Sequence, residues 1–442
     1  EEGSTQWENL LSKIQVKGGT EQQNVMFYSM LYRSFLWPAL RSDVNGQFID
    51  EAGKVRKENY HYYTLPSLWD DYRNKLVLLS IFSPEVTSDV ISSIINEGEI
   101  KGFIPTFFHG DHAASFIAGS YMRGIRNYDV KKAYELLLNN AYKEGGTRPH
   151  IAEYIAKGYV PEQDIKDPKI ETVANAGVTK TLEYAYDDHA LSLLAKELND
   201  TEHYNDLVKR SKNYANVFDK STTFMRGKLA DGSWVTPFNP EFPYYEYMYR
   251  EANAWQVSFF TPHDMPGLVQ LYGGAKPFEA KLDELFTKPW NPNYIAWNIS
   301  GFIGQYCHGN QPDHEAPFSY YFVNKPEKSQ QRIDEILETM YGIGPEKLAM
   351  SGMDDAGEMS SWYVFGALGL YPLSPADPEY IVTVPIFKEV SWTTPAGKKV
   401  TIKKPNGKRN LEMIKVNGSK IDGYFISHDL FKNGGEIQLT TK

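Results

Sequence analysis

Apolar residues recur at spacings of three and four residues up to about residue 370, a pattern that predicts a succession of amphipathic helices. Helices are expected around these apolar stripes: Val25–Phe35, Leu68–Leu79, Val86–Ile94, Val130–Ala141, Leu182–Leu193, Leu207–Phe218, Phe278–Phe286 and Ile333–Met340. Ser83 and Pro84 come just before one of these stripes, as expected of a helix start with proline in its first turn. Strands do not alternate with helices, so a parallel-sheet fold is disfavoured.

The hydrophobic period changes around Pro372–Pro378, a segment with three prolines. The residues that follow predict short strands at Tyr380–Val384, Glu389–Thr393, Lys399–Lys403 and Leu411–Val416. Asn417-Gly418, directly after the last of these, is a hairpin turn signal. We therefore expect a mainly α protein, with a helical domain over residues 1–374 and a small β domain over residues 375–442.

Charge and composition narrow the classes of function. The net charge of −10 disfavours a nucleic-acid partner, because phosphate binding needs a basic surface. No apolar run reaches the roughly 18 residues of a membrane span, and the first residues of the sequence do not show the charged-then-apolar pattern of a targeting segment. A single cysteine, Cys307, excludes an intramolecular disulfide framework and a cysteine-cluster metal site. The 9 Trp, 30 Tyr and 23 Phe provide flat faces that pack cores and also stack on sugar rings.

Polar and aromatic residues are concentrated in five loops of the predicted helical scaffold, where functional residues are expected. These loops are Leu68–Arg73, Phe108–Ala113, Arg250–Gln256 with the nearby Pro262–Asp264, Cys307–Glu315 and Gly352–Glu358. Cys307 beside His308 suggests a thiol nucleophile, but adjacent residues seldom form a nucleophile–base pair. His308, Asp313 and His314 suggest zinc, but their spacing matches no standard zinc pattern. The remaining carboxylates, amides and aromatics are the chemistry of sugar binding and glycoside hydrolysis.

Glycoside hydrolysis requires two carboxyl groups, one of which acts as an acid and the other as a base or nucleophile. Glu251 and Asp355 lie in two of the five loops and are the candidates for this pair. The alternative for either residue is a solvated surface charge or a helix cap. Asp354-Asp355, just before a helical pattern, fits a cap on that interpretation.

In these loops the sequence resembles the exo-acting α-mannosidases of glycoside hydrolase family 92. The resemblance runs from about residue 7 to the C-terminus and rests on motifs that occur in the same order. These are Gly18-Gly19-Thr20-Glu21, Ser67–Arg73, Gly110-Asp111-His112-Ala113, Glu251–Gln256 with Pro262-His263-Asp264, His308–Pro312 with His314, and Gly352–Tyr363. One such motif alone is weak evidence, but the ordered set is specific.

The resemblance implies an (α/α)6 toroid followed by a small C-terminal β domain. Family members also place an N-terminal β-sandwich before the toroid, and this chain opens directly on the first toroid helix. That sandwich is the expected protein partner, and it is expected to contribute to the substrate site. The implied activity is calcium-dependent, inverting hydrolysis of terminal α-mannosides of N-glycans or mannans, in a secreted or periplasmic bacterial enzyme.

Carried over motif by motif, the resemblance implies that Glu251 is the general acid, Asp355 the general base and Asp354 a supporting acidic residue. Asn310 and Gln311 fall on the motif that approaches Ca²⁺. The residues implied in substrate binding are Trp69, Asp70, Arg73, Asp111, His112, Asn253, Trp255, Gln256 and His308. The aromatic setting expected to raise the pKa of the acid is Trp255 with the Tyr244–Tyr249 cluster.

Two positions depart from the family pattern. Ala252 follows the acid where the family usually has glycine, so a positive φ at this position would cost about 1 kcal/mol. Gln311 stands where many members have Glu, so a calcium ion loses one charged ligand and is expected to bind less tightly. Two other functions stay open: a non-catalytic mannose-binding protein on the same scaffold, and another toroidal exo-glycosidase.

Overall fold

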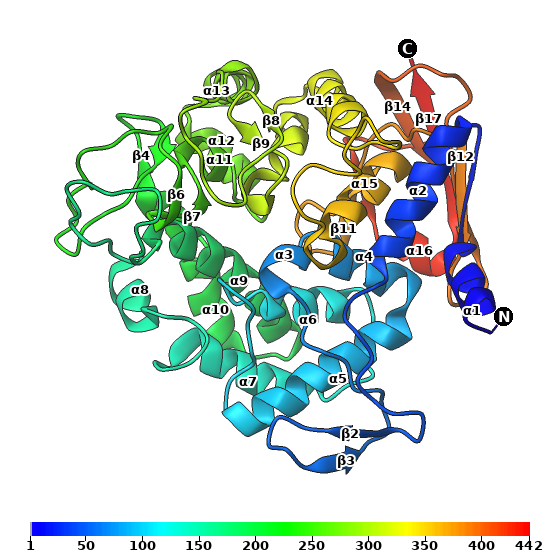
Figure 1. The fold of residues 1–442 in the computed structure, drawn as a ribbon, viewed down its shortest axis with the longest axis horizontal. Helices are drawn as coiled ribbons and strands as arrows, with labels where there is room; N and C mark the ends of the chain where they lie inside the picture. The colour runs from blue at the N-terminus through cyan, green and yellow to red at the C-terminus, as the bar shows by residue number, and fades with distance from the viewer. Residues whose placement is uncertain (1) are drawn as a thin grey trace.

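The computed structural model describes residues 2–442. Up to residue 368 the chain consists mainly of helices and loops. Figure 1 shows the helices arranged around the centre of the molecule, from α2 in blue to α15 in orange, with the strands of the C-terminal region at one side. The helices are α1 (Glu2–Leu11), α2 (Glu21–Ser34), α3 (Leu68–Asp71), α4 (Lys75–Phe82), α5 (Pro84–Lys101), α6 (Ala113–Met122), α7 (Val130–Tyr142), α8 (Ile151–Lys157), α9 (Gly177–Glu197), α10 (Thr201–Arg210), α11 (Ala254–Val257), α12 (Met265–Leu271), α13 (Ala275–Thr287), α14 (Pro326–Thr339), α15 (Glu358–Leu368) and α16 (Asp429–Asn433).

Most of the predicted helices are confirmed, and α5 begins at Pro84 as expected. The stripe Leu68–Leu79 is instead divided into α3 and α4. The break occurs because Glu358, from α15, accepts hydrogen bonds from the backbone N–H groups of Asn74 and Lys75 (3.2 and 3.1 Å). A carboxylate distant in the sequence therefore caps α4 and ends the first helix early.

The stripe Leu207–Phe218 is also not a single helix. Helix α10 ends at Arg210, a short 3-10 helix, η1 (Asn213–Val217), follows, and Phe218 begins strand β4 (Phe218–Asp219). The prediction of one helix was wrong because Arg210 is buried and donates two hydrogen bonds to Asp188 of α9 (2.9 and 2.8 Å). This long-range contact holds the end of α10, which the periodicity of Leu207, Tyr214 and Phe218 does not reveal.

The four predicted C-terminal strands are confirmed: three of them belong to a six-stranded sheet in the order β1-β12-β13-β17-β14-β15, and the strand predicted at Tyr380–Val384 belongs to a separate three-stranded sheet. The strands of the six-stranded sheet are β1 (Ile14–Lys17), β12 (Glu389–Thr393), β13 (Lys399–Lys403), β14 (Leu411–Val416), β15 (Ser419–Lys420) and β17 (Gly435–Thr441). Asn417 and Gly418 both have positive φ in the β14–β15 turn, as a type I′ hairpin requires. Strand β1, near the N-terminus, pairs antiparallel with β12, with Val16 opposite Val390.

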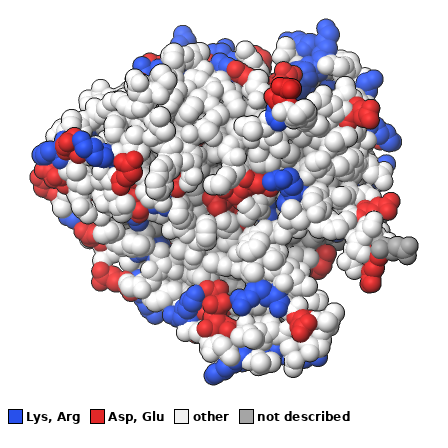
Figure 2. Space-filling view, in the orientation of Figure 1, with Lys and Arg blue, Asp and Glu red and all other residues white. Residues whose placement is uncertain are grey.

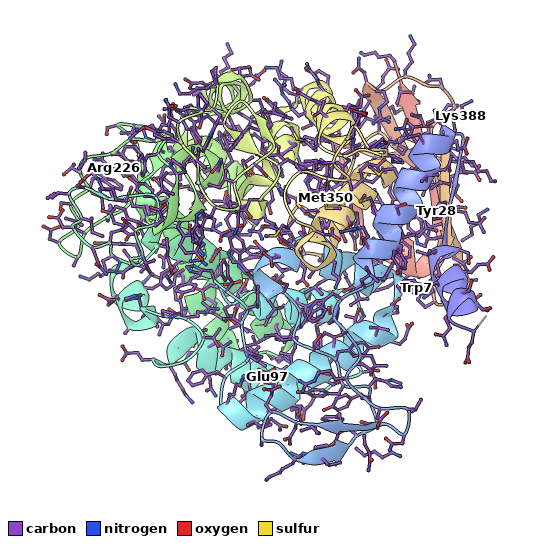
Figure 3. All side chains as sticks on the ribbon, in the orientation of Figure 1. Trp7, Tyr28, Glu97, Arg226, Met350 and Lys388 are labelled. Carbon is purple, nitrogen blue, oxygen red and sulfur yellow. The ribbon has the colours of Figure 1, made fainter. Side chains whose placement is uncertain are left out.

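The remaining strands are short. A three-stranded sheet contains β10 (Leu370–Tyr371), β11 (Glu379–Val382) and β16 (Phe425–Ser427), and hairpins form from β2 (Gln47–Ile49) with β3 (Val55–Lys57), β4 with β5 (Phe224–Met225), β6 (Tyr244–Tyr247) with β7 (Tyr249–Ala252), and β8 (Phe302–Ile303) with β9 (Tyr306–Cys307). In Figure 3, Trp7, Tyr28 and Lys388 lie on the side where α1 and α2 meet the C-terminal sheet. The hydroxyl of Tyr28 donates to the carbonyl of Ile14 (3.1 Å) and so fastens α2 to β1.

A network of buried charges joins the helices on the far side of the ring from the C-terminal sheet. Asp188 of α9 accepts hydrogen bonds from Arg148 Nη1 (2.6 Å), from Arg210 and from the hydroxyl of Tyr154 (3.1 Å). Arg148 also donates to Asp111 (2.9 Å). These charges are stable in burial because each is paired and hydrogen-bonded. Within residues 2–442, no helix has the length and apolar character that crossing a membrane requires.

Candidate active site

A cavity of about 270 Å³ opens among the loops inside the ring of helices. Figure 2 shows acidic side chains gathered near the centre of this face, inside the ring seen in Figure 1. The walls come from α3, the start of η4 (Asp355–Gly357) and three loops that the sequence analysis selected. The lining residues are Trp69, Asp70, Phe107, Phe108, Glu251, Asn298, Ser300, Gly309, Asn310, Gly352, Met353 and Asp355.

Glu251 reaches this cavity from strand β7 and is 3% exposed. Its backbone has φ of 49°, a left-handed conformation that is strained for a residue with a long side chain. One carboxylate oxygen accepts a hydrogen bond from Asn310 Nδ2 (3.1 Å) and the other from Asn298 Nδ2 (3.2 Å). Burial raises the pKa of Glu251, and the two amide donors only partly oppose that rise. A carboxyl group in this setting holds its proton more readily than one in water.

Asp355, the other member of the carboxylate pair, lines the same cavity. It has φ of 45° and is followed by Ala356 with φ of 58°, so the turn before α15 is strained at two successive residues. Burial, together with the negative charges of Glu251 and Asp354, raises the pKa of Asp355 to about 6, although the hydrogen bond from Gln311 opposes this rise. At neutral pH this carboxyl group is mostly ionised and can accept a proton.

The two carboxylates are connected by adjacent residues of one loop. Asn310 Nδ2 donates to Glu251, and Gln311 Nε2 donates to Asp355. The loop of Asn310 and Gln311 can lie close to the loop of Asp355 because Gly309 and Gly352 come together at the backbone. A Cβ added to Gly352, whose φ is +70°, would lie 2.2 Å from the carbonyl oxygen of Gly309. Only glycine tolerates both this approach and this φ.

The amide oxygens of the same pair are the candidates for binding the calcium ion that the resemblance implies. Gln311 Oε1 is buried and has no hydrogen-bond partner among residues 2–442. Because Asn310 uses its Nδ2 for Glu251, its side-chain oxygen is also available to an ion. Amide oxygens suit a hard cation such as Ca²⁺, so these two residues fit the ion. The described residues contain no converging group of three His, Cys, Asp or Glu that would bind a metal without them.

Two other predicted substrate-binding residues line the cavity. Trp69 donates its indole N–H to Glu183 of α9 (2.7 Å), which fixes the ring plane beside the cavity. Asp70 accepts a hydrogen bond from the hydroxyl of Ser67 (2.5 Å). Burial raises the pKa of Asp70 to about 8, with a further contribution from the charge of Asp355.

Three more of the predicted substrate-binding residues lie behind this wall. Arg73 is 3% exposed, stacks its guanidinium 4.6 Å from the ring centre of Tyr72 and lies 3.5 Å from Glu315. His112 stacks on the ring of Tyr72 (ring centres 3.9 Å apart), and its Nδ1 lies 3.0 Å from Asp187. Burial by itself lowers the pKa of His112, but the carboxylates of Asp187 and Glu183 raise it to about 9. Asp111 is held by Arg148 and Asn140.

Asn253 and Gln256 are also buried away from the cavity. They form a reciprocal capping box at the start of α11, in which the side chain of each accepts from the backbone N–H of the other. Trp255 packs edge-on against Phe224 (ring centres 4.7 Å apart). His308 lies between the hydroxyls of Tyr306 and Tyr341 (2.8 and 2.7 Å). Direct sugar contacts by these four residues stay predictions.

Asp354 and Ala252 support the loops that present the carboxylates. Asp354 accepts hydrogen bonds from Arg33 Nε (2.9 Å) and from the hydroxyl of Ser360 (2.7 Å), which ties the turn before α15 to α2. Ala252 lies in β7 and does not have positive φ; the left-handed residue is Glu251 itself. The expected cost of replacing glycine at residue 252 therefore does not arise.

Several lining residues were missed from the sequence. Phe107 and Phe108 are 42% and 43% exposed, and Met353 is 60% exposed, so they form an apolar rim at the cavity. Phe108 and Met353 belong to loops that were selected and Phe107 directly precedes one of them, so their position in the sequence was an available signal. Asn298 belongs to a loop with no motif of its own, and only its contact with Glu251 reveals it.

Comparisons with known proteins find matches over the whole chain. The family model described as the glycosyl hydrolase family 92 catalytic domain matches residues 1–442. A curated relative, described as an uncharacterized secreted glycosidase of Arthroderma benhamiae, is 27% identical and matches 98% of this chain and 55% of its own length.

Two solved structures of Bacteroides thetaiotaomicron proteins are similar in fold and sequence. A family GH92 α-mannosidase in complex with mannoimidazole superposes with a TM-score of 0.92 at 29% identity, over 100% of this chain and 59% of its own. A family GH92 inverting mannosidase superposes with a TM-score of 0.87, also at 29% identity, over 99% of this chain and 62% of its own. The chain thus spans less than two thirds of the length of these relatives.

Proposed function

The chain belongs to glycosyl hydrolase family 92, and we propose that it is the catalytic part of a calcium-dependent, inverting exo-α-mannosidase that acts on N-glycans or mannans. Membership of the family makes it a glycoside hydrolase. The choice of mannose is supported by the two Bacteroides thetaiotaomicron structures, which are described as mannosidases.

The observation that carries the proposal is the placement of Glu251 and Asp355 on one cavity. Both carboxylates are largely buried, both have a raised pKa and both lie on strained left-handed residues. Such strain persists where the surrounding structure fixes a residue for function. A binding protein needs no such pair, because hydrogen bonds to sugar hydroxyls do not depend on raised carboxyl pKa values.

In the proposed reaction Glu251 donates its proton to the glycosidic oxygen as the bond from that oxygen to the anomeric carbon breaks. Asp355 removes a proton from a water molecule, whose oxygen forms the new bond to the anomeric carbon from the opposite side. The products are the alcohol of the leaving group and a sugar of inverted configuration. A further proton transfer through water returns Glu251 to its neutral form and Asp355 to its charged form.

Asn310 and Gln311 are the residues proposed to hold Ca²⁺ through their amide oxygens. A bound calcium ion would supply positive charge to sugar hydroxyls that enter the cavity. The two amide groups also orient Glu251 and Asp355 through their N–H groups. The same residues therefore set the direction of both carboxylates.

The proposal extends to features around this site. The helices that surround the cavity are proposed to form an (α/α)6 toroid, supported by the similarity in fold to the family GH92 structures. An N-terminal β-sandwich remains the proposed protein partner, and a mannose-containing glycan the proposed substrate. A secreted or periplasmic location is proposed, in keeping with the curated secreted glycosidase that the chain resembles.

The test is hydrolysis of aryl and disaccharide α-mannosides by the full-length protein, followed by NMR of the first sugar anomer formed. β-Mannose is expected, and Asp355→Asn is expected to abolish its release while the binding of a mannose analogue persists. Release of α-mannose first would overturn the inverting mechanism. Binding of mannose without turnover would identify a mannose-binding protein, and turnover of another sugar would identify a different exo-glycosidase.

A further inference from the structure

A second cleft, of about 430 Å³, lies along α5 and shares no lining residue with the cavity of Glu251 and Asp355. In Figure 3, Glu97 marks α5 near the lower edge of the molecule, whereas Met350, just before the loop of Asp355, lies nearer the centre. The cleft is bounded by the segment after the β2–β3 hairpin, by α5 and by the segment before α7. We name it the α5 cleft and define it by Glu58, Tyr60, Asn96, Glu99, Arg126 and Tyr128.

One face of α5 presents a regular row of polar residues to this cleft. Asp89, Ser92, Asn96 and Glu99 follow one another at spacings of three, four and three residues, so they lie on the same side of the helix. Amphipathic helices of a globular protein usually turn such a face to solvent. Here the middle of the face is covered: Asn96 is only 8% exposed.

Asn96 is the residue that distinguishes the cleft from an ordinary surface hollow. Its side-chain oxygen Oδ1 is buried and has no hydrogen-bond partner among the described residues. A buried amide oxygen without a partner costs about 1–3 kcal/mol, so a native protein normally provides a donor for it. Asn96 lines the cleft, so a ligand held in the cleft is a candidate to provide that donor.

The exposed charged groups around Asn96 include both hydrogen-bond acceptors and a hydrogen-bond donor. Glu58 and Glu99 make no side-chain hydrogen bond to another described residue and accept only. Arg126 stacks its guanidinium 4.0 Å from the ring centre of Tyr121 and donates only. Sugar hydroxyls both donate and accept, so one neutral ligand can satisfy all of these groups, whereas a basic peptide offers mainly donors.

The other acidic residues of the cleft do not form a cation site. Asp89 is occupied by His61, whose Nδ1 lies 3.0 Å away, and Asp129 caps α7 through the N–H of Lys132 (2.9 Å). Within residues 2–442 no three acidic or histidine side chains converge as metal ligands. The rings of Tyr60 and Tyr128 line the cleft and have apolar faces of the kind on which sugars stack. The hydroxyl of Tyr128 donates to the carbonyl of Ile117 (3.2 Å).

We propose that the α5 cleft is a second binding site, distinct from the catalytic cavity, for a neutral oligosaccharide chain. Its volume falls in the range of small-ligand sites, roughly 300–1,000 Å³. A polymeric glycan bound there would be retained near the catalytic cavity, so occupancy raises the local concentration of chain ends. The choice of mannan as the ligand to test rests on the proposed function.

The experiment measures retardation of the full-length protein in native gels that contain dissolved α-mannan, in a Glu251→Gln background that prevents degradation of the polymer. Asn96→Ala and, separately, Tyr60→Ala are expected to weaken mannan binding about tenfold, which is the effect of about 1.4 kcal/mol. Glu85→Ala, on the exposed first turn of the same helix, is the matched control. Turnover of an aryl α-mannoside by the same substitutions in the otherwise native protein is expected to stay unchanged.

Retardation that is equal in all folded variants would overturn the cleft as a sugar site, and so would a loss shared by Glu85→Ala. A lysine-rich peptide whose binding depends on Asn96 and Tyr60, without any effect on mannan, would also overturn it. Should Asn96→Ala not fold, as judged by its melting curve, Tyr60→Ala and Glu99→Gln at the more exposed rim decide the matter. Failure of the proposed function is recognised separately, because native protein would then leave aryl α-mannosides intact whatever the gels report.

Discussion

Asn310 and Gln311 are neighbours in the chain, yet they donate hydrogen bonds to two carboxylates 104 residues apart, Glu251 and Asp355. A rigid dipeptide thereby sets the relative position of the proposed acid and base. The side-chain oxygen Oε1 of Gln311 has no hydrogen-bond partner among the described residues, so it is available to the proposed Ca²⁺.

Replacing Glu251 by Gln removes the proton that the leaving group requires. Hydrolysis of mannosides with poor leaving groups is expected to slow by roughly 10²–10⁴-fold, and hydrolysis of activated aryl mannosides much less. Single-substrate kinetics with both kinds of leaving group provide the comparison. Equal losses for the two kinds would remove Glu251 from the role of general acid.

We expect the contact of Asn298 with Glu251 to affect the alkaline limb of the pH profile. Its amide opposes the burial that raises the pKa of Glu251, so removing the amide raises that pKa further. The acid must be protonated, and activity is lost as pH rises through its pKa; Asn298→Gly therefore shifts the alkaline limb of kcat/KM to higher pH. Glycine is chosen because φ at this residue is 61°.

Asn293→Ala is the control for this shift, since Asn293 is exposed in the same loop and does not contact Glu251. The acid limb should follow Asp355, with activity lost as pH falls through about 6 in both variants. An alkaline limb that stays at the same pH in Asn298→Gly would contradict the contact as a determinant of the acid's pKa.

Calcium removal is expected to abolish turnover, and added Ca²⁺ to restore it. Gln311→Glu supplies a charged ligand, so calorimetry should detect tighter calcium binding with turnover retained. The same change removes an amide donor from Asp355 and adds a negative charge beside it, so the acid limb should move to higher pH. Full activity after exhaustive chelation would instead assign Asn310 and Gln311 to bracing the loop.

Gly352→Ala tests the close approach of the two loops. The added methyl group would collide with the carbonyl of Gly309 and strain a φ of +70°, so the loop that carries Asp355 must move. We expect kcat to fall by at least about tenfold, because catalysis is sensitive to displacements of about 1 Å. Gly407→Ala, with nothing within 4 Å of the new methyl, is the control and should leave both kcat and the melting temperature unchanged.

Asp188→Ala tests the buried charge network. The substitution leaves Arg148 and Arg210 without their shared carboxylate in the protein interior. Removing one partner of a buried pair costs about 3–5 kcal/mol, which denaturant unfolding would detect. Glu135→Ala breaks the exposed ion pair with Lys132 and should leave stability nearly unchanged. Similar unfolding curves for the two variants would show that the network contributes little.

The predicted site residues divide according to what each local pattern can reveal. Asn253 and Gln256 stand at the spacing of a capping box, which was a signal in the sequence for their place at the start of α11. His112 and His308 fall in motifs with no such signal, and only packing turned their rings to Asp187 and to two tyrosines. A motif states that a segment approaches a site, but not which of its side chains face the cavity.

By itself, the sequence determined the features that depend on near neighbours in the chain. Periodic apolar residues predicted α5, α7 and α13, and alternation with Asn417-Gly418 predicted the C-terminal strands, because helical and turn conformations are set by contacts a few residues apart. Only the tertiary structure decided the features that depend on distant contacts.

Three such contacts join segments that are distant in the sequence. Glu358 separates α3 from α4 by a hydrogen bond to Asn74, 284 residues earlier in the chain. Strand β1 joins the C-terminal sheet, and Gly309 meets Gly352 at the cavity. The closing of long loops is paid in chain entropy and repaid by burial and hydrogen bonds across the whole fold, so no local window of sequence contains its outcome. That is also why the sequence could name Glu251 and Asp355, but only folding places both on one cavity.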